Sequence, residues 1–356
     1  MSLPSHEEHH DLGATFMELN DAEAVRHYGD FAAEYQSLKT AAAVLDFSFR
    51  SRLVLIGADR IQFLHSQCTN DIKRLGAGQG CYTAITNNKG RMQGDANVFV
   101  LADEILLDSE PGQTGAMTKR FEQFIVSDDV EIVDAAPHYG LLTVQGPKSA
   151  DVILSLGLET ELPTEQFGSV KCAVPVIGEL YVASNPRLSS AGFDLFIPVA
   201  SMGVLIDKLV TATRRVGGGL AGWEAFDIAR IDAGIPRFGE DMTEANLAPE
   251  AGIESRAISY NKGCYIGQEV LNRLRTFAEV SRKLCRLKVS ADPATPPEPG
   301  TKLLKDGKEA GTLTSVTGIP GGSVVALGYV RKQWLGSPQV FQLPDVGTAE
   351  STGGPD

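Results

Sequence analysis

The sequence predicts a mixed α+β protein of two or three domains that ends in a small β-barrel or sandwich. The chain has 356 residues, which is too long for one small core. Helix-like and strand-like segments alternate through residues 21–233, and from residue 282 onward only short strand-like pieces follow, separated by turns.

The composition is that of an ordinary globular protein, with 43% hydrophobic and 22% charged residues. The formal charge of −13 argues against nucleic acid or an anionic membrane as a partner. The chain has no apolar run long enough to span a bilayer, and residues 1–11 are polar, so we expect a cytoplasmic location. The cysteines are odd in number and widely spaced, which predicts reduced thiols and no zinc site: Cys68, Cys81, Cys172, Cys264 and Cys285.

The first half begins with a polar segment, residues 1–20, that we expect to be a flexible tail despite its histidines His6, His9 and His10. Apolar residues at helical spacing then predict one or two helices over 21–45. Further helices are expected at 60–67, with Asp59 as its cap, and at 114–126. Strands are expected at 52–57, 80–86, 91–101, 105–108 and 130–133. The strands at 80–86, 91–101 and 105–108 are expected to form an antiparallel meander.

A second series of strands and helices starts at residue 139. Its strands are expected at 139–144, 170–176, 179–183 and 193–198, and its helices at 149–156, 201–216 and 222–233. The barrel strands are expected at 283–289, 301–304, 310–317, 324–329 and 339–343. The segment after Pro344 is short, polar and rich in glycine, which predicts a disordered tail.

Residues 261–276 carry the clearest chemical signal. Cys264 lies two residues after Lys262 and shortly before a segment with the pattern of a short helix. A nearby cation and a helix N-terminus both favour thiolate over thiol, so Cys264 is a candidate reactive cysteine, with a buried structural cysteine as the alternative. Asp95 is a second candidate because carboxylates are depleted from strands unless they face solvent or perform a task.

The string Lys-Gly-Cys-Tyr-Ile-Gly-Gln-Glu at 262–269 resembles the signature of the YgfZ-type folate-binding proteins. Residues 230–242, 246–247 and 250–252 resemble the aminomethyltransferase (T protein) of the glycine cleavage system, and the similarity covers about residues 22–335. This resemblance implies a three-domain cloverleaf of the aminomethyltransferase type, with two α+β units and a C-terminal β-barrel. The implied ranges are 1–20 (flexible tail), 21–135 and 136–282 (folate-binding units), 283–344 (barrel) and 345–356 (disordered tail).

The resemblance also implies a folate site. Tyr82 corresponds to the tyrosine of the family's Tyr-Thr/Ser strand, Asp95 to its folate-binding aspartate, Asp194 to the acid of its Gly-Phe-Glu strand and Arg230 to the arginine of its Arg-Leu-Glu-Ala segment. A carboxylate can accept paired pterin N–H groups, and an arginine fork can hold the glutamyl tail or a protein carboxylate. The implied cofactor is tetrahydrofolate or a one-carbon derivative of it.

Two departures separate this chain from the aminomethyltransferases. Those proteins carry a second aspartate where this chain has Gly94, and they lack the cysteine string. We therefore expect a tetrahydrofolate-binding accessory protein that supports the assembly or repair of iron-sulfur clusters, with assembly proteins or client enzymes as partners. Cys264 would be the reactive thiol, and Lys262 and the helix N-terminus would tune its reactivity. Because a cluster generally needs four thiolates or substitutes, any further ligands would come from a partner, a second chain or glutathione.

Two enzymatic alternatives remain. The first is transfer of an aminomethyl or other one-carbon group to tetrahydrofolate, with Asp95 as the acid or base. The second is folate-dependent demethylation or oxidation of small amines. The sequence has no glycine-rich dinucleotide fingerprint, so this chain alone would not bind a flavin for such an oxidation.

Overall fold

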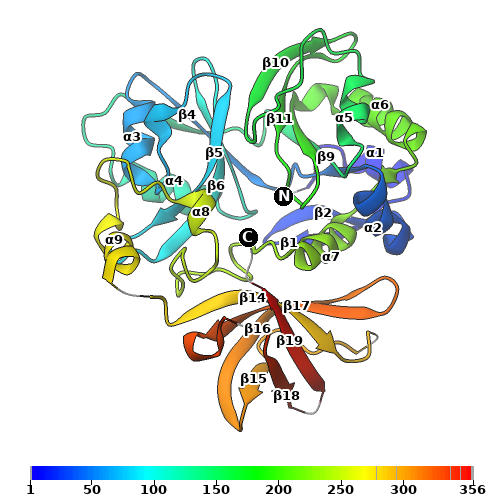
Figure 1. Ribbon diagram of the computed structural model, residues 1–356. Helices are drawn as coiled ribbons and strands as arrows, with labels where there is room; N and C mark the ends of the chain where they lie inside the picture. Colours follow the sequence, from blue (N-terminus) through cyan, green and yellow to red (C-terminus); the bar gives the residue numbers. More distant parts are fainter. Residues whose placement is uncertain (1, 278, 294, 337, 345, 354–356) are drawn as a thin grey trace. The chain divides into compact units, whose positions relative to one another are not determined.

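The computed structural model describes residues 2–277, 279–293, 295–336, 338–344 and 346–353 (Figure 1). By its internal contacts the chain divides into two compact units. The first comprises Met1–His65, Asp71–Tyr82 and Ala96–Ala229, and the second comprises Ser66–Asn70, Thr83–Asp95 and Arg230–Asp356. Within the described ranges, none of the helices has the length and apolar character needed to cross a bilayer.

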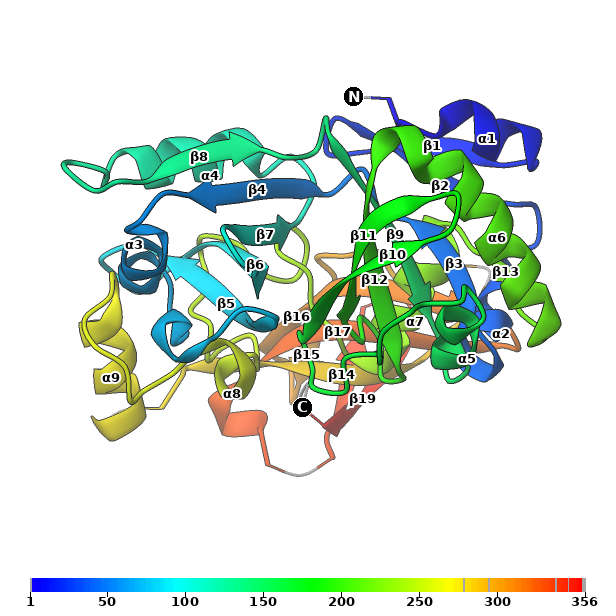
Figure 2. The ribbon, with the colours of Figure 1, turned by 90° about the horizontal axis from the view of Figure 1, so that it is seen from above.

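The first unit contains a six-stranded sheet in the order β10-β11-β12-β9-β3-β13 (Figure 2). Its strands are β3 (Ala43–Asp46), β9 (Tyr139–Gln145), β10 (Ser169–Val174), β11 (Gly178–Ser184), β12 (Gly192–Pro198) and β13 (Gly219–Leu220). Neighbours are antiparallel except β3 and β13, which are parallel. Helices α5 (Ser149–Leu154) and α6 (Met202–Arg215) pack on it, and the buried α6 residues recur every three or four positions, so one face of the helix joins the core.

A five-stranded sheet has the order β5-β6-β7-β4-β8. Its strands are β4 (Ser51–Ile56), β5 (Gln79–Thr86), β6 (Met92–Val100), β7 (Ile105–Ser109) and β8 (Glu131–Asp134). Helix α3 (Arg60–Gln67) and the 3-10 turn η1 (Ile72–Arg74) lie between β4 and β5, and α4 (Thr114–Glu122) packs on β4 and β8. The unit boundary falls inside β5, after Tyr82, and inside β6, after Asp95.

The N-terminal segment is ordered, so the expectation of a flexible tail over residues 1–20 is wrong for the described residues. It forms helix α1 (His6–Asp11) and strand β1 (Thr15–Leu19), which pairs with β2 (Ala22–His27). His9 is buried and its Nε2 lies 2.9 Å from the Asp46 carboxylate, to which Ser5 also donates a hydrogen bond. Burial alone would raise the pKa of Asp46, but these hydrogen bonds and the His9 charge lower it. The segment is polar but not solvated, because its histidine pairs with a carboxylate inside the core.

Of the one or two helices expected over residues 21–45, the structure has one, and it is shorter than that range. Strand β2 occupies its first part, and helix α2 (Phe31–Thr40) begins after Asp30, whose carboxylate accepts hydrogen bonds from the amides of Ala32 and Ala33. This is an ordinary N-cap, and it sets the start of the helix.

The second unit contains the end of α7 (Trp223–Ala233), the short α8 (Glu254–Ala257), α9 (Gln268–Phe277) and a closed six-stranded barrel in the order β14-β17-β16-β15-β18-β19. The barrel strands are β14 (Arg282–Ser290), β15 (Lys302–Lys305), β16 (Lys308–Ile319), β17 (Ser323–Arg331), β18 (Val340–Leu343) and β19 (Gly347–Gly353). The 3-10 turns η2 (Val199–Ser201) and η3 (Lys332–Trp334) precede α6 and β18 respectively.

The C-terminal segment 345–356 does not form the disordered tail that we expected, as far as it is described. Residues 347–353 are strand β19, which pairs with both β14 and β18 and so closes the barrel. Residues 345 and 354–356 lie outside the described residues. The division into two units also cuts across the expected ranges 21–135, 136–282 and 283–344, which remain a prediction.

Candidate functional site

The six residues singled out from the sequence belong to different units. Tyr82 and Asp194 lie in the first unit, whereas Asp95, Arg230, Lys262 and Cys264 lie in the second. All of them are buried except Cys264, which is exposed.

Asp194 lies on β12, in the interior of the six-stranded sheet, opposite Thr143 of β9 and Ala183 of β11. Its side chain is fully buried, and its two oxygens accept three hydrogen bonds. Arg187 donates two of them, from Nε at 3.0 Å and Nη2 at 2.6 Å, and the amide of Asn185 donates the third at 2.8 Å. The carboxylate is therefore largely occupied by the protein itself.

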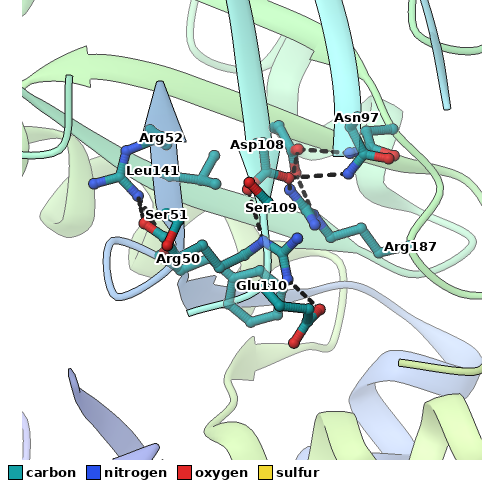
Figure 3. Close-up of polar contacts among 12 residues, drawn as sticks. Arg50, Ser51, Arg52, Asn97, Asp108, Ser109, Glu110, Leu141 and Arg187 are labelled. Atoms are coloured by element: carbon teal, nitrogen blue, oxygen red, sulfur yellow. Dashed lines mark hydrogen bonds and ion pairs between the residues drawn. The ribbon is translucent and has the colours of Figure 1, made fainter. Parts of the chain in front are cut away.

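Arg187 belongs to a buried set of charges that sequence reasoning missed. We call Arg50, Asp108, Glu110, Arg187 and Asp194 the arginine–carboxylate cluster, of which the first four are labelled in Figure 3. Asp108 lies at its centre: Arg50 donates to it from Nε at 2.7 Å, and Arg187 from Nη2 at 2.6 Å. A second bond from Arg50 reaches Glu110 at 2.7 Å.

The positions of these groups follow from strand register. Asp108 on β7 lies opposite Arg52 of β4 and Asn97 of β6, and the Asn97 amide donates to it at 2.9 Å. Arg187 lies between β11 and β12, so its bonds to Asp108 and Asp194 link the two sheets of the first unit. The same signal that drew attention to Asp95, a carboxylate inside a strand, would have identified Asp108.

The electrostatics of the cluster favour ionised groups. Burial by itself raises the pKa of Asp108, but Arg187 and Arg50 outweigh it and hold this pKa far below its ordinary value. Burial likewise lowers the pKa of Arg187, and the charges of Asp108 and Asp194 reverse that effect and raise it. Three carboxylates and two guanidinium groups give the cluster one excess negative charge.

Tyr82 and Asp95 lie on neighbouring strands of the five-stranded sheet. Tyr82 is the last residue of β5 that belongs to the first unit, and Asp95 is the last residue of β6 that belongs to the second. Both side chains are buried, 7% and 8% exposed, respectively.

Arg230 has a carboxylate partner within its own unit. Its guanidinium donates to Asp241 and, at 2.9 Å, to the hydroxyl of Ser315 on β16. Asp241 also accepts a hydrogen bond from Thr314, and its carbonyl accepts one from the hydroxyl of Tyr329 on β17 at 2.9 Å. The fork predicted for a glutamyl tail or a protein carboxylate thus holds a carboxylate that fixes residues 230–242 to the barrel.

The cysteine motif forms a turn that is held by two loops of the second unit. Lys262 donates from Nζ to the carbonyls of Cys68 at 2.8 Å and Asn70 at 2.6 Å. On the other side, Thr86 donates to the carbonyl of Ile266 at 2.6 Å. Gly267 has φ +90°, and a Cβ there would lie 2.6 Å from the carbonyl oxygen of Asn87, so only glycine fits.

Cys264 is exposed, whereas Cys68, Cys172 and Cys285 are buried and Cys81 is partly buried. Helix α9 begins at Gln268, four residues beyond the thiol. The hydrogen bonds of Lys262 go to backbone carbonyls, and its ammonium lies 4.9 Å from the centre of the Tyr265 ring. The turn therefore presents one thiol to solvent while the residues around it hold the backbone in place.

The fold is that of an aminomethyltransferase. The structure aligns over its whole length with the crystal structure of the glycine cleavage system aminomethyltransferase T from Bartonella henselae, covering 97% of that chain with a TM-score of 0.86 at 22% identity. This confirms the predicted α+β fold of the aminomethyltransferase type with a C-terminal β-barrel.

Residues 5–262 match the model of the GCVT N-terminal domain, and the chain belongs to this family. It is 32% identical over 292 residues to the "Putative transferase At1g60990, chloroplastic" of Arabidopsis thaliana, a match that covers 82% of this chain and 65% of the plant protein. It is 27% identical over 347 residues to an aminomethyltransferase of Rubrobacter xylanophilus, covering 95% of this chain and 89% of that protein. An aminomethyltransferase of Mycobacterium avium is 28% identical over 270 residues, which is 75% of this chain and 72% of that protein.

Replacing Asp108 by Asn is expected to lower the free energy of unfolding by about 3 kcal/mol, because two buried arginines lose their shared counter-charge. Asp108 has a lowered pKa in the folded state, so its contribution is complete above the unfolded value of about 4 and is lost as the pH falls. Urea unfolding at several pH values measures both effects. The stability of the wild type should fall more steeply below pH ~4 than that of Asp108→Asn.

The exposed Asp103, which precedes β7, provides the control: Asp103→Asn should leave stability within about 0.5 kcal/mol of the wild type. Equal effects of the two substitutions would contradict the role given to the cluster.

Cys264 is expected to be the cysteine that reacts first with a thiol reagent such as dithionitrobenzoate at pH 8. Cys264 is exposed, so the reagent can reach its thiol. A buried thiol such as Cys285 should react slowly, because burial raises its pKa to about 11. Stopped-flow absorbance should show one fast phase that Cys264→Ser abolishes and Cys285→Ser retains. A fast phase that survives Cys264→Ser would show that another thiol is the accessible one.

Proposed function

We propose that this chain is a tetrahydrofolate-binding accessory protein of the YgfZ type that supports the assembly or repair of iron-sulfur clusters. The observation that carries the proposal is the motif turn, in which Lys262 and Gly267 hold the backbone and the Cys264 side chain is exposed. A thiol placed in this way can reach another molecule. The cytoplasm is the expected location, and neither nucleic acid nor a membrane is an expected partner.

The proposed cofactor is tetrahydrofolate or a one-carbon derivative, and family membership and the aminomethyltransferase fold support it. The proposed binding residues are Tyr82, Asp95, Asp194 and Arg230. Their roles differ, however, because Asp194 already accepts three hydrogen bonds and a carboxylate offers about four acceptor positions. Asp95, which by the family resemblance corresponds to the folate-binding aspartate, is the carboxylate that we assign to direct contact with the folate nitrogens, with Asp194 and Arg230 acting largely through the groups they hold.

The thiol chemistry is assigned to Cys264. A single thiolate cannot complete the ligand set of an iron-sulfur cluster, which usually needs four. The proposed partners are therefore iron-sulfur assembly proteins or client enzymes that bring their own ligands. Lys262, expected from the sequence to tune the thiol, contributes by fixing the turn through its bonds to Cys68 and Asn70.

The second candidate function is that of a folate-dependent aminomethyltransferase that transfers a one-carbon group to tetrahydrofolate, with Asp95 as acid or base. The names of the relatives from Rubrobacter xylanophilus and Mycobacterium avium favour it. Under this alternative Cys264 would have no part in turnover, which separates the two functions experimentally.

Folate binding is tested by isothermal titration calorimetry with tetrahydrofolate under anaerobic conditions. Wild type should bind, and Asp95→Asn should bind at least about tenfold more weakly, because it loses the charge of the carboxylate assigned to contact with the ligand. Asp194→Asn is a poorer probe because it also disturbs Arg187. Asp103→Asn is the matched control and should bind as the wild type does; absence of binding by the wild type would refute the proposal.

The role of Cys264 is tested by complementation of a strain that lacks its YgfZ-type protein, with the activity of an iron-sulfur enzyme as readout. Wild type and Cys285→Ser should restore this activity, whereas Cys264→Ala should not. In parallel, purified protein is assayed for methylenetetrahydrofolate formation from an aminomethylated lipoyl carrier. Turnover that persists in Cys264→Ala, together with full complementation by that variant, would favour the aminomethyltransferase.

A further inference from the structure

The second unit contains a cavity of about 840 Å³. It is lined neither by the motif string at 262–269 nor by the proposed folate residues. Its wall is built from the end of helix α9, the start of barrel strand β14, the end of β17, the 3-10 turn η3 and the end of β19 (elements labelled α9, β14, β17 and β19 in Figure 1). Its volume falls within the range of about 300–1,000 Å³ that is typical of small-molecule sites.

The wall is largely apolar. Leu274 of α9, Leu284 of β14 and Val330 of β17 contribute to it, and Leu335 and Pro338 extend it beyond η3. Leu284 and Val330 are fully buried and stand behind the cavity surface, whereas Leu274 and Leu335 are partly exposed and Pro338 is exposed, so these three supply the apolar surface that a ligand can touch. An apolar ligand body in this cavity would exchange water for packed hydrocarbon.

The charged groups of the wall have a surplus of cations. Both carboxylates are engaged: Glu254 accepts a hydrogen bond from Tyr260 at 2.5 Å, and Glu279 pairs with Lys332 at 2.6 Å. Within the described part of the chain, Arg275 and Lys283 have no carboxylate within ion-pairing distance. Arg275 instead lies 4.2 Å above the ring of Tyr260.

A third donor belongs to the same wall. The indole nitrogen of Trp334 is buried and has no hydrogen-bond acceptor among the described residues. A buried donor without an acceptor is costly. Among the described residues, Arg275 and Lys283 thus lack a carboxylate partner and the Trp334 N–H group lacks an acceptor. All three residues line the same cavity.

We propose that this cavity binds an amphipathic organic anion, that is, a molecule with a carboxylate-type head and an apolar body. The head would pair with Arg275 and Lys283, and the body would lie against Leu274, Leu335 and Pro338. This inference does not depend on folate binding or on the chemistry of Cys264, because it rests on different residues.

Decanoate below its critical micelle concentration is a suitable probe, and Trp334 is a built-in reporter. The chain has two tryptophans, and the other, Trp223, lies in the first unit within an aromatic group with Phe47, Phe49 and Phe226. In a Trp223→Phe background, Trp334 fluorescence should change saturably with decanoate. Decyltrimethylammonium, with the same tail and the opposite charge, should give no saturable change.

Substitutions of lining residues test whether decanoate binds in this cavity. Lys283→Met and Arg275→Leu should each raise the dissociation constant for decanoate about tenfold, as expected for loss of one charge-assisted contact. Lys288→Met is the matched control, since Lys288 is an exposed lysine on the same strand that does not line the cavity, and it should bind as the parent does. Leu274→Phe, which adds bulk to the cavity from α9 without adding a second tryptophan, should weaken the decanoate response.

Three results would overturn the proposal. They are the absence of a saturable change with decanoate, equal binding of the anionic and cationic probes, and equal effects of Lys283→Met and Lys288→Met. Circular dichroism and urea unfolding of each variant ensure that a lost response does not come from a lost fold. If Lys283→Met binds tetrahydrofolate with the affinity of the wild type in calorimetry, the loss of decanoate binding is independent of the proposed folate function.

Discussion

The first unit depends on the bonds between Arg187 and the two aspartates Asp108 and Asp194. One guanidinium joins a strand of the five-stranded sheet to a strand of the six-stranded sheet, at distances of 2.6 Å to each carboxylate. A buried ion pair adds little net stability compared with a well-packed apolar contact, but a half-broken one is strongly unfavourable. The arrangement therefore tolerates few alternatives: any register that separates these three residues leaves a charge buried alone.

Buried charges with fixed partners also hold the second unit together. Arg230 and Asp241 hold the segment after α7 against the barrel, and Lys262 satisfies two carbonyls of an otherwise irregular loop. Both of these buried cations are paired, Arg230 with a carboxylate and Lys262 with backbone carbonyls. Residues that a family resemblance would place at a ligand thus also support the framework, and substitutions at Asp194, Arg230 or Lys262 will change fold and function together. Cys264, which is exposed, is the cleaner probe.

Much of the fold was readable from the sequence, because most elements carry local signals. The helix predicted at 60–67 and the helix after the cysteine motif are present, and the barrel strands lie within a few residues of their predicted positions. The errors fall where a distant partner decides the outcome. His9 is ordered by Asp46, and strand β19 by β14, and neither partner can be inferred from the local pattern. The arginine–carboxylate cluster was missed for the same reason, since Arg187 lies 79 residues from Asp108 along the chain.

The discontinuous make-up of the second unit has a consequence for how the chain is made. Thr69, whose hydroxyl donates to the carbonyl of Ala257, is synthesised 188 residues before that acceptor, and Asn70 precedes Lys262 by 192 residues. At about 5–20 residues per second, these loops would wait roughly 10–40 seconds on the ribosome for their partners. During that interval the ends of β5 and the beginning of β6 have no completed unit around them. The emerging chain is then vulnerable to pairing with another strand, and a chaperone that shields residues 66–95 would have its greatest effect before α9 has been translated.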